Sequence, residues 1–394
     1  MLLNAADKAL WRLALPMIFS NITVPLLGLV DTAVIGHLDS PVYLGGVAVG
    51  ATATSFLFML LLFLRMSTTG LTAQAWGAKD PQRLARALVQ PLALALGAGV
   101  LIILLRLPLI DLALHIVGGS EAVLEQARRF LEIRWLSAPA SLANLVLLGW
   151  LLGVQYARAP VILLVVGNLL NIVLDLWLVM GLRMNVQGAA LATVTAEYAT
   201  LIIGLLMAKR VLTLRGVSLA MLKNAWRGDL RRLLALNRDI MLRSLLLQLC
   251  FGALTVFGAR LGSDIVAVNA VLMTMLTFTA YALDGFAYAV EAHSGQAYGA
   301  RDGSQLLEVW RAACRQSGMV ALAFALIYSL AGQYIIALLT SLPSLQQLAD
   351  RYLIWQTILP VVGVWCYLLD GMFIGATRAA EMRNSMAEIG RASC

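Results

Sequence analysis

The sequence repeats itself at an offset of 222 residues, and this repeat constrains the fold more than any other feature. Gln74–Asp80 reads QAWGAKD and Gln296–Asp302 reads QAYGARD. Gly149 returns as Gly371 at the same offset. Because one offset serves positions more than a hundred residues apart, the two halves differ by almost no insertion. The repeat therefore predicts two lobes of the same construction.

Hydropathy decides which kind of lobe this is. Hydrophobic residues make up 61% of the chain, charged residues 13%, and the mean hydropathy is +0.84. A soluble domain carries roughly 25% charged residues. Several apolar stretches exceed the ~20 residues that a helix needs to cross a bilayer. Because these stretches are unbroken and do not alternate with period two, they predict helices and not barrel strands. We expect an all-α polytopic membrane protein.

The apolar stretches predict ten transmembrane helices, six in the first half and four in the second. They span residues 10–36, 43–65, 88–115, 131–155, 160–181, 187–208, 235–258, 264–288, 314–340 and 352–377. The first of them is long enough to span and has no small-residue cleavage site after it, so we do not interpret it as a signal peptide.

Basic residues predict the orientation. Of the 29 Lys and Arg residues, 21 fall on the side that holds the N-terminus and 7 on the other, with one in the tail. By the positive-inside rule the N-terminus is cytoplasmic. The net charge of +8 is then explained by loops facing the cytoplasm, and we expect no nucleic-acid partner.

The predicted spans divide the chain into two lobes, a linker between them and a C-terminal tail. Residues 1–208 form an N-lobe with helices 1–6, residues 209–234 a cytoplasmic linker, and residues 235–386 a C-lobe with helices 7–10. Six spans per repeat place the lobes in the same orientation, related by a pseudo-two-fold axis along the membrane normal. We expect a substrate cavity where the lobes meet, a lipid bilayer around a monomer, and a surface helix within residues 217–230.

The repeat also makes a prediction about the C-terminus. Glu388 should correspond to Val166, inside the fifth span, yet the chain continues as the polar sequence EIGRASC. If the C-lobe had six helices like the N-lobe, two more helices, 11 and 12, would follow, and the sequence lacks them. We expect residues 387–394 to be an artefactual tail, since a common sequencing adapter encodes EIGRASC in one frame. A genuine ten-helix protein is the alternative.

Carboxylates inside membrane spans are functional candidates because they are costly there. The first half has Asp31, Asp175 and Glu197. Asp31 lies roughly 31 Å along helix 1 and Asp175 roughly 22 Å along helix 5, and Thr193 lies roughly 9 Å below the outer end of helix 6. Asp31, Asp175 and Thr193 therefore share the outer half of the bilayer.

Helix 5 adds two amides to this group. Asn168, Asn171 and Asp175 are spaced i, i+3 and i+7, which puts them on one helical face. With Asp31 and Thr193 they offer oxygen ligands to a hard monovalent cation such as Na⁺. A low-dielectric pocket also favours the protonated form of a carboxyl group, which suits proton uptake. No other metal and no cofactor is expected.

Structural alternatives stand beside these roles. Asp31 could lie at the interface with its carboxylate in the headgroup region, and Asn168 could simply bond a neighbouring helix. For Glu197 we favour a role in helix packing over one in coupling. Pro16 and Pro25 in helix 1 predict a kink. Cys250, Cys314 and Cys366, at no metal-ligand spacing, are interpreted as buried thiols.

The second half lacks the acids of the first. Asp31 maps to Ala253. The second half has instead Asp284 and Asp370, each in a Leu-Asp-Gly triplet, and Glu291. The lobes therefore share a fold but not a chemistry. We place ion coupling in one lobe only and expect Asp284 and Asp370 to line the substrate path or shape the cavity.

Five segments resemble the multidrug and toxin extrusion (MATE) family, and within it the enterobacterial type of the DinF branch. They are PLLGLVDTAVIGHL (25–38), TAQAWGAKD (72–80), GNLLNIVLDLWLV (167–179), GAALAT (188–193) and GQAYGARD (295–302). The resemblance implies twelve helices in two six-helix lobes, and a secondary antiporter that exports drugs or toxins against inward H⁺ or Na⁺. It also implies a cation site at Asp31, Asn171, Asp175 and Thr193, with Pro16 where helix 1 is proposed to bend.

The sequence thus predicts an inner-membrane antiporter for drugs, toxins or other amphipathic organic compounds. A lipid-linked oligosaccharide or lipid flippase of the same superfamily is the alternative, but flippases usually place several cations in the cavity and the spans here hold almost none. A membrane-embedded prenyltransferase would need an Asp-rich motif that the sequence lacks. We therefore expect no enzymatic activity.

Overall fold

The computed structural model describes residues 3–393, without the side chains of residues 24–29, 390, 392 and 393. The described chain is helical apart from short connections. Its α-helices are α1 (Ala5–Gly36), α2 (Pro41–Leu61), α3 (Phe63–Gly77), α4 (Pro81–Leu104), α5 (Arg106–Val117), α6 (Glu121–Arg134), α7 (Ala138–Gly153), α8 (Arg158–Asp175), α9 (Asn185–Leu214), α10 (Leu219–Asn224), α11 (Leu230–Leu261), α12 (Ser263–Gly299), α13 (Gly303–Leu339), α14 (Pro343–Gly375) and α15 (Ala379–Ser393). A 3₁₀ turn (Trp135–Ser137) joins α6 to α7, and a π-helical segment (Leu176–Gly181) extends α8.

Helix bounds reproduce the internal repeat. α12, α13 and α14 begin and end 222 residues after the segments 41–77, 81–117 and 121–153. The two halves are therefore homologous lobes built from the same succession of helices. Nine helical stretches among the fully described residues are long and apolar enough to cross a membrane, and α1, with 32 residues, is comparable in length. The all-α polytopic fold is confirmed.

The repeated QA(W/Y)GA(K/R)D motif forms the same turn in both lobes. Asp80 and Asp302 cap the helices that follow, and their side chains accept hydrogen bonds from backbone N–H groups of the first turn. Lys79 and Arg301 adopt left-handed backbone angles, with φ of 51° and 55°. These caps explain why the helices continue well beyond the apolar core of each span.

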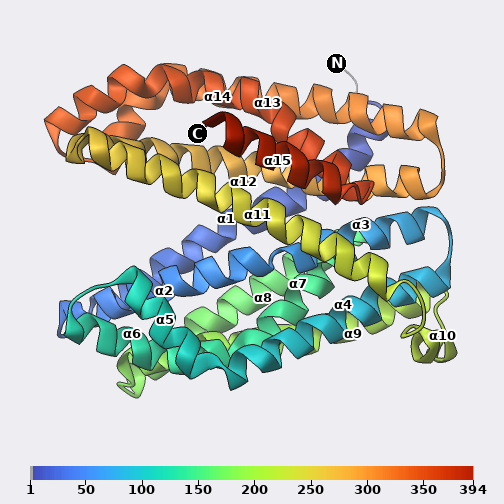
Figure 1. Cartoon of the computed structure of the whole chain (residues 1–394), viewed down its shortest axis with the longest axis horizontal. Coiled ribbons are helices and arrows are strands. Elements are labelled where there is room, and N and C mark those ends of the chain that lie inside the picture. The colour runs from blue at the N-terminus through green and yellow to red at the C-terminus, as the bar shows by residue number, and fades with distance from the viewer. Residues whose placement is uncertain (1–2, 394) are drawn as a thin grey trace.

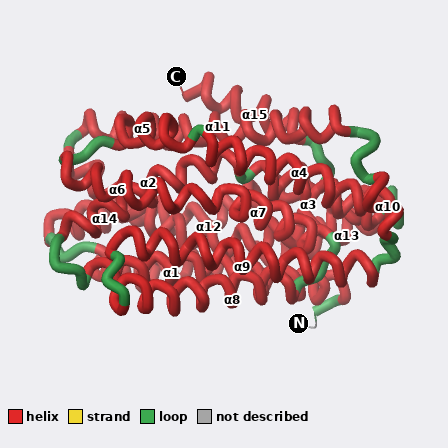
Figure 2. Tube along the Cα trace, turned by 90° about the horizontal axis from the view of Figure 1, so that it is seen from below, coloured by secondary structure: helices red, strands yellow, loops and turns green. Residues whose placement is uncertain are grey.

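The helices form two layers along one long axis. Figure 1 shows α12–α15 in the upper layer and α2–α9 in the lower one, with α1 and α11 crossing between them. The connections gather at the two ends of the bundle (Figure 2). We call the end that holds the start of α1, the turns after α3 and α12, and α10 the N-terminal face.

α1 belongs to both lobes. Its first half packs on the C-lobe, where Trp11 stacks edge-on against Phe286 at 4.9 Å between ring centroids. Its second half packs in the N-lobe, where Val34 and Ile35 join a core with Phe130. α11 makes the reciprocal crossing, since Ile240 on α11 contacts a cluster that includes Met66 of α3.

α3 and α12 cross in direct backbone contact. A Cβ added to Gly77 would lie 1.9 Å from the Gln296 carbonyl oxygen, and one added to Gly299 would lie 2.1 Å from that of Gln74. These two contacts are equivalent under the 222-residue repeat, so the pseudo-two-fold axis passes between them. Only glycine permits so close an approach at these positions. The crossing fixes how the lobes meet near the N-terminal face.

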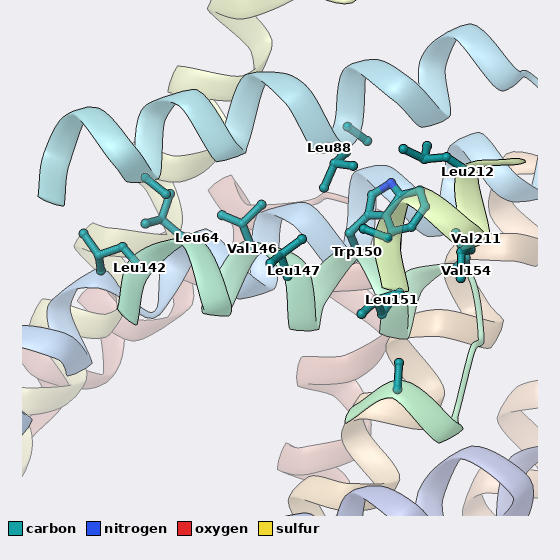
Figure 3. Packing of buried hydrophobic residues seen from close by; sticks show 14 of the residues in the cluster. Leu64, Leu88, Leu142, Val146, Leu147, Trp150, Leu151, Val154, Val211 and Leu212 are labelled. Carbon is teal, nitrogen blue, oxygen red and sulfur yellow. The ribbon is translucent and has the colours of Figure 1, made fainter. Parts of the chain in front are cut away.

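The largest core lies in the N-lobe around α7. Trp150 is fully buried there and donates a 3.1 Å hydrogen bond from its indole N–H to the carbonyl of Leu84. Leu88 and Leu212 converge on the same indole ring (Figure 3). Small residues let α7 approach its neighbours, since a Cβ on Gly149 would meet the Arg65 carbonyl at 2.5 Å.

Several expected boundaries were wrong. The second, eighth and ninth spans extend 11–12 residues further toward the N-terminal face than hydropathy indicated. Most of the 209–234 linker is helical, because α9 continues to Leu214 and α11 begins at Leu230. Of the surface helix expected within residues 217–230, α10 forms only residues 219–224. Residues 387–393 continue α15, which packs beside α11. Cys366 is exposed on α14, and Cys250 and Cys314 are only partly buried, so the expectation of three buried thiols was wrong.

Candidate functional site

Three helices of the N-lobe bring the expected cation-site residues together. Asp31 comes from the second half of α1, Asn171 and Asp175 from α8, and Thr193 from the third turn of α9. Asn171 donates from Nδ2 to Thr193 Oγ1 at 3.4 Å. The Asp175 side chain lies close enough to the Asp31 carboxyl group for their charges to interact. The four side chains thus form one connected cluster.

This cluster is rich in acceptors and poor in donors. Asp175 is 1% exposed and Asn171 is 4% exposed. Among the described residues, no N–H or O–H donor reaches Asp31 Oδ1, Asn171 Oδ1 or either carboxylate oxygen of Asp175. Buried polar atoms are normally hydrogen-bonded, and two adjacent carboxylates disfavour double ionisation. A proton or a cation between the carboxyl groups would satisfy both conditions.

The backbone changes its winding directly after Asp175. Leu176–Gly181 is π-helical, and Asp175 is the last residue of α8. A π-helical turn is rare and is frequent at functional sites, because it widens the helix and redirects its backbone groups. The unusual turn therefore coincides with the most buried carboxylate of the cluster.

A cavity of about 610 Å³ lies beside the cluster, within the range of small-molecule sites. Its walls come from α1, α2, α6, α7, α8 and α9. Asp31, Asn168, Asn171 and Thr193 line it, whereas Asp175 is not among the lining residues. Most of the remaining wall is apolar and includes Phe58 and Leu145. Asn168 forms no hydrogen bond to a neighbouring helix among the described residues, so its polar group faces the cavity.

Glu197 lines the same cavity but is paired. Its carboxylate accepts a 3.3 Å hydrogen bond from Asn144 Nδ2 and lies 3.9 Å from Arg134 Nη2. Arg134 also lies over the Phe58 ring, at 5.4 Å from its centroid. This pairing fits the packing role that was favoured for Glu197 and gives the cavity one opposed pair of charges.

Pro16 lies in the part of α1 that packs on the C-lobe, between the buried residues Leu13 and Met17. α1 is one helix through this position. Proline removes the backbone N–H that would bond the Arg12 carbonyl, so the helix is locally weakened here. Fifteen residues, roughly 22 Å, separate Pro16 from Asp31. Pro25 lies among the residues whose side chains are not described.

The acids of the second half form a different cluster. Asp370 on α14 pairs with Arg243 on α11 at 2.6 Å. Asp284 on α12 lies close enough to Asp370 and Arg243 to interact with their charges. Neither Asp284 nor Asp370 lines the 610 Å³ cavity. Three acids and two arginines meet here, near the boundary between the lobes.

Glu291 completes this cluster across the lobe boundary. Arg65 of α3 donates to Glu291 of α12 through Nη1 at 3.1 Å and Nη2 at 3.3 Å. The guanidinium group also lies 4.3 Å from the centroid of the Tyr288 ring. Both charged side chains are about 2% exposed or less. Arg65 was expected at the membrane surface, and the continuation of α2 into α3 buries it instead.

Comparison with known proteins now identifies the family. The MatE family model matches residues 16–177 and 240–382. The chain belongs to the MATE family. This MATE protein is 88% identical over 385 residues to DNA damage-inducible protein F of Escherichia coli K12, a match that covers 98% of this chain and 84% of that protein. The DinF branch expected from the sequence is confirmed.

More distant relatives support the same family assignment. The Thermotoga maritima protein named "Probable multidrug resistance protein NorM" is 29% identical over 196 residues, covering 48% of this chain and 42% of that protein. A solved MATE structure described as the bent conformation superposes with a TM-score of 0.85 at 24% identity, covering 97% of this chain and 85% of the other. This MATE protein is therefore a multi-pass membrane transporter and not an enzyme.

Sequence reasoning missed three functional candidates of this MATE protein, all arginines. Arg65, Arg134 and Arg243 were counted among the charges on either side of the membrane, but each lies inside a helical stretch of membrane-spanning length and pairs with a carboxylate. The statement that the spans hold almost no cations was therefore wrong. A signal existed: Glu291 and Glu197 each needed a partner inside the bilayer.

Proposed function

We propose that this protein exports amphipathic organic compounds across the bacterial inner membrane in exchange for inward H⁺ or Na⁺, with the cation bound at Asp31 and Asp175. The unpartnered oxygens of Asp31, Asn171 and Asp175 support the proposal most directly. A monovalent cation or a proton is the smallest species that satisfies them. The basic N-terminal face would be cytoplasmic, and the protein would act as a monomer.

The cavity supports the substrate class. Apolar walls and a few polar groups suit amphipathic compounds better than sugars or ions. The name of the Thermotoga relative concerns multidrug resistance. Because Asp31, Asn171 and Thr193 belong to both the cluster and the cavity wall, a bound cation and a bound substrate would share residues. Competition for these residues is a physical basis for antiport.

Coupling requires that the cation bind one conformation better than another. In this proposal, neutralisation of the Asp31–Asp175 pair removes the repulsion between α1 and α8. α1 then bends where Pro16 weakens it, the cavity narrows and substrate leaves outward. Return of the empty transporter requires release of the cation to the cytoplasm.

A flippase for lipid-linked oligosaccharides is less well supported. Its anionic diphosphate would need unpaired cations, whereas the one arginine that lines the cavity, Arg134, lies beside Glu197. The overall balance of the cavity lining, with Asp31, Glu197 and Arg134, is negative.

Transport in proteoliposomes tests the proposal, with pH and Na⁺ gradients imposed separately. Asp31→Asn and Asp175→Asn should abolish gradient-driven export of a fluorescent cationic dye while leaving the protein folded. Asp39→Asn is the matched control, because Asp39 is an exposed carboxylate eight residues further along. Unchanged export in both cluster variants would refute the assignment of coupling to this site.

A further inference from the structure

A small crevice on the N-terminal face gathers three arginines. Arg83 and Arg86 lie in the first two turns of α4, and Arg232 lies in the first turn of α11. Gln90 and Asp229 also line the crevice. Its volume is about 40 Å³, room for about three water molecules. A compact anion fits this space, and a drug-sized molecule does not.

The positive charge in the crevice is not neutralised by the protein. Asp229 Oδ2 lies 3.8 Å from Arg86 Nη1, and the Asp229 side chain is 67% exposed. Arg86 Nε is buried and has no hydrogen-bond acceptor among the described residues. Arg232 donates to two neutral oxygens, Gln74 Oε1 and Thr377 Oγ1, each at 3.3 Å. The crevice thus holds three guanidinium groups and one exposed carboxylate.

The repeat supplies a second copy of this crevice with different charges. The equivalent crevice lies against α1, α12 and α13 and has a volume of about 130 Å³. Offset by 222, Arg83 becomes Gln305, Arg86 becomes Glu308 and Arg232 becomes Leu10. Both crevices lie on the same face, so neither the fold nor the positive-inside rule requires arginine at these positions. The arginines are particular to the first crevice.

The rim of the arginine crevice is apolar and exposed. Gln90 Nε2 donates to the Gly228 carbonyl at 2.9 Å, which ties the linker to α4 beside the crevice. Trp226 in this linker is 62% exposed, and Leu230 at the start of α11 is 52% exposed. Tryptophan and leucine exposed beside arginines at the end of a bundle are typical of the headgroup level of a bilayer.

We propose that this crevice binds a phosphate group, presented by the headgroup of an anionic phospholipid. Arginine binds phosphate oxygens through paired N–H donors, and basic pockets between membrane helices on the cytoplasmic side bind anionic headgroups. The phosphate would occupy the space between Arg83, Arg86 and Arg232. The glycerol and acyl chains would lie over Trp226 and Leu230, outside the crevice. The site joins α4 of the N-lobe to α11, the helix that begins the C-lobe.

Binding can be measured on the full chain purified in detergent. Phosphatidylglycerol, phosphatidylcholine and inorganic phosphate are titrated separately, with the melting temperature and native mass spectrometry as readouts. Phosphatidylglycerol should raise the melting temperature and be retained in the gas phase, and phosphatidylcholine should do neither. Arg83→Gln/Arg86→Gln should weaken the apparent affinity for phosphatidylglycerol roughly 30-fold.

A charge-matched control separates the crevice from the face as a whole. Lys209→Gln/Arg210→Gln removes two exposed charges near the end of α9, and it should leave phosphatidylglycerol binding within about twofold of wild type. Equal losses in the two double variants would overturn the proposal. Equal stabilisation by inorganic phosphate and by the lipid would assign the site to a free anion and overturn the lipid.

A transplant keeps the proposal testable if Arg83→Gln/Arg86→Gln does not fold. Gln305→Arg/Glu308→Arg places two arginines in the second crevice of an otherwise unchanged protein. It should add one phosphatidylglycerol per molecule in native mass spectra. Failure to gain a lipid, in a variant that melts normally, would count against arginine geometry as the determinant of binding.

Discussion

Arg65 on α3 and Glu291 on α12 form a buried ion pair across the lobe boundary, with two N–O distances of 3.1 and 3.3 Å. Removal of one partner leaves an unpaired charge where water does not reach. Arg65→Met should therefore lower the free energy of unfolding by about 3–5 kcal/mol, and Arg65→Met/Glu291→Leu should recover most of it. Melting in detergent measures both effects.

Two outcomes would contradict this prediction. One is a double variant no more stable than Arg65→Met. The other is an equal loss in Arg378→Met, because the Arg378–Glu381 pair has side chains 59% and 44% exposed and should change the melting temperature little.

Because α3 and α12 cross in backbone contact, we expect that one methyl group added at the crossing lowers the stability of the protein. Gly77→Ala places a Cβ 1.9 Å from the Gln296 carbonyl oxygen, and this atom belongs to the backbone, so the helices themselves must move. The variant should lose about 1–3 kcal/mol of stability. Gly97→Ala is the control, since nothing lies within 4 Å of its added Cβ, and it should be neutral or slightly stabilising. Similar melting temperatures for Gly77→Ala and Gly97→Ala would show that α3 and α12 can move apart at little energetic cost.

Thr193 can distinguish the two proposed coupling ions. Its hydroxyl accepts from Asn171 Nδ2 and donates to the Ala189 carbonyl at 3.2 Å. Thr193→Val removes an oxygen ligand without changing the side-chain volume much. If Na⁺ is the coupling ion, the Na⁺ concentration that gives half-maximal export should rise about tenfold. If H⁺ is the coupling ion, export driven by a pH gradient should stay near the wild-type rate. The readout is dye efflux against each gradient. If a Na⁺ gradient drives export and Thr193→Val leaves its Na⁺ dependence unaltered, Thr193 holds no ion.

The Arg134–Glu197 pair sets the charge of the cavity. Arg134→Gln leaves Glu197 without its cation and should favour cationic over anionic substrates by about fivefold. Arg134→Gln/Glu197→Gln should restore the original preference. Competition between cationic and anionic dyes of similar size measures the ratio. A preference that moves toward anions would contradict the assignment of these side chains to the substrate cavity.

Much of the architecture was predictable because the repeat is a property of the sequence itself. The offset between Gln74 and Gln296 implied homologous lobes, and helix bounds confirm it. Helical spacing placed Asn171 and Asp175 on one face, and depth along the helices placed Asp31 and Thr193 near them. Those quantities depend only on helix geometry. The role of this cluster in coupling stays a prediction.

Other features depend on contacts between helices that hydropathy does not report. Apolar stretches mark the bilayer core, so they ended the second span at Arg65, whereas packing against α12 carries the helical stretch on to Gly77. Arg65 was misplaced for this reason. Its partner Glu291 is distant in sequence, 226 residues away. No local pattern encodes such pairs.

The π-helical turn after Asp175 divides the fifth span into two parts whose side chains follow different directions. A turn of this kind holds one extra residue relative to α-helix, so everything beyond it is rotated by roughly 100° from the direction that uninterrupted helix would give. Deleting one residue between Leu176 and Gly181 would cancel that rotation while leaving every ligand before it in place. An insertion or deletion in this short segment would therefore change which residues of the following chain face the N-lobe, while Asn171 and Asp175 keep their positions on α8.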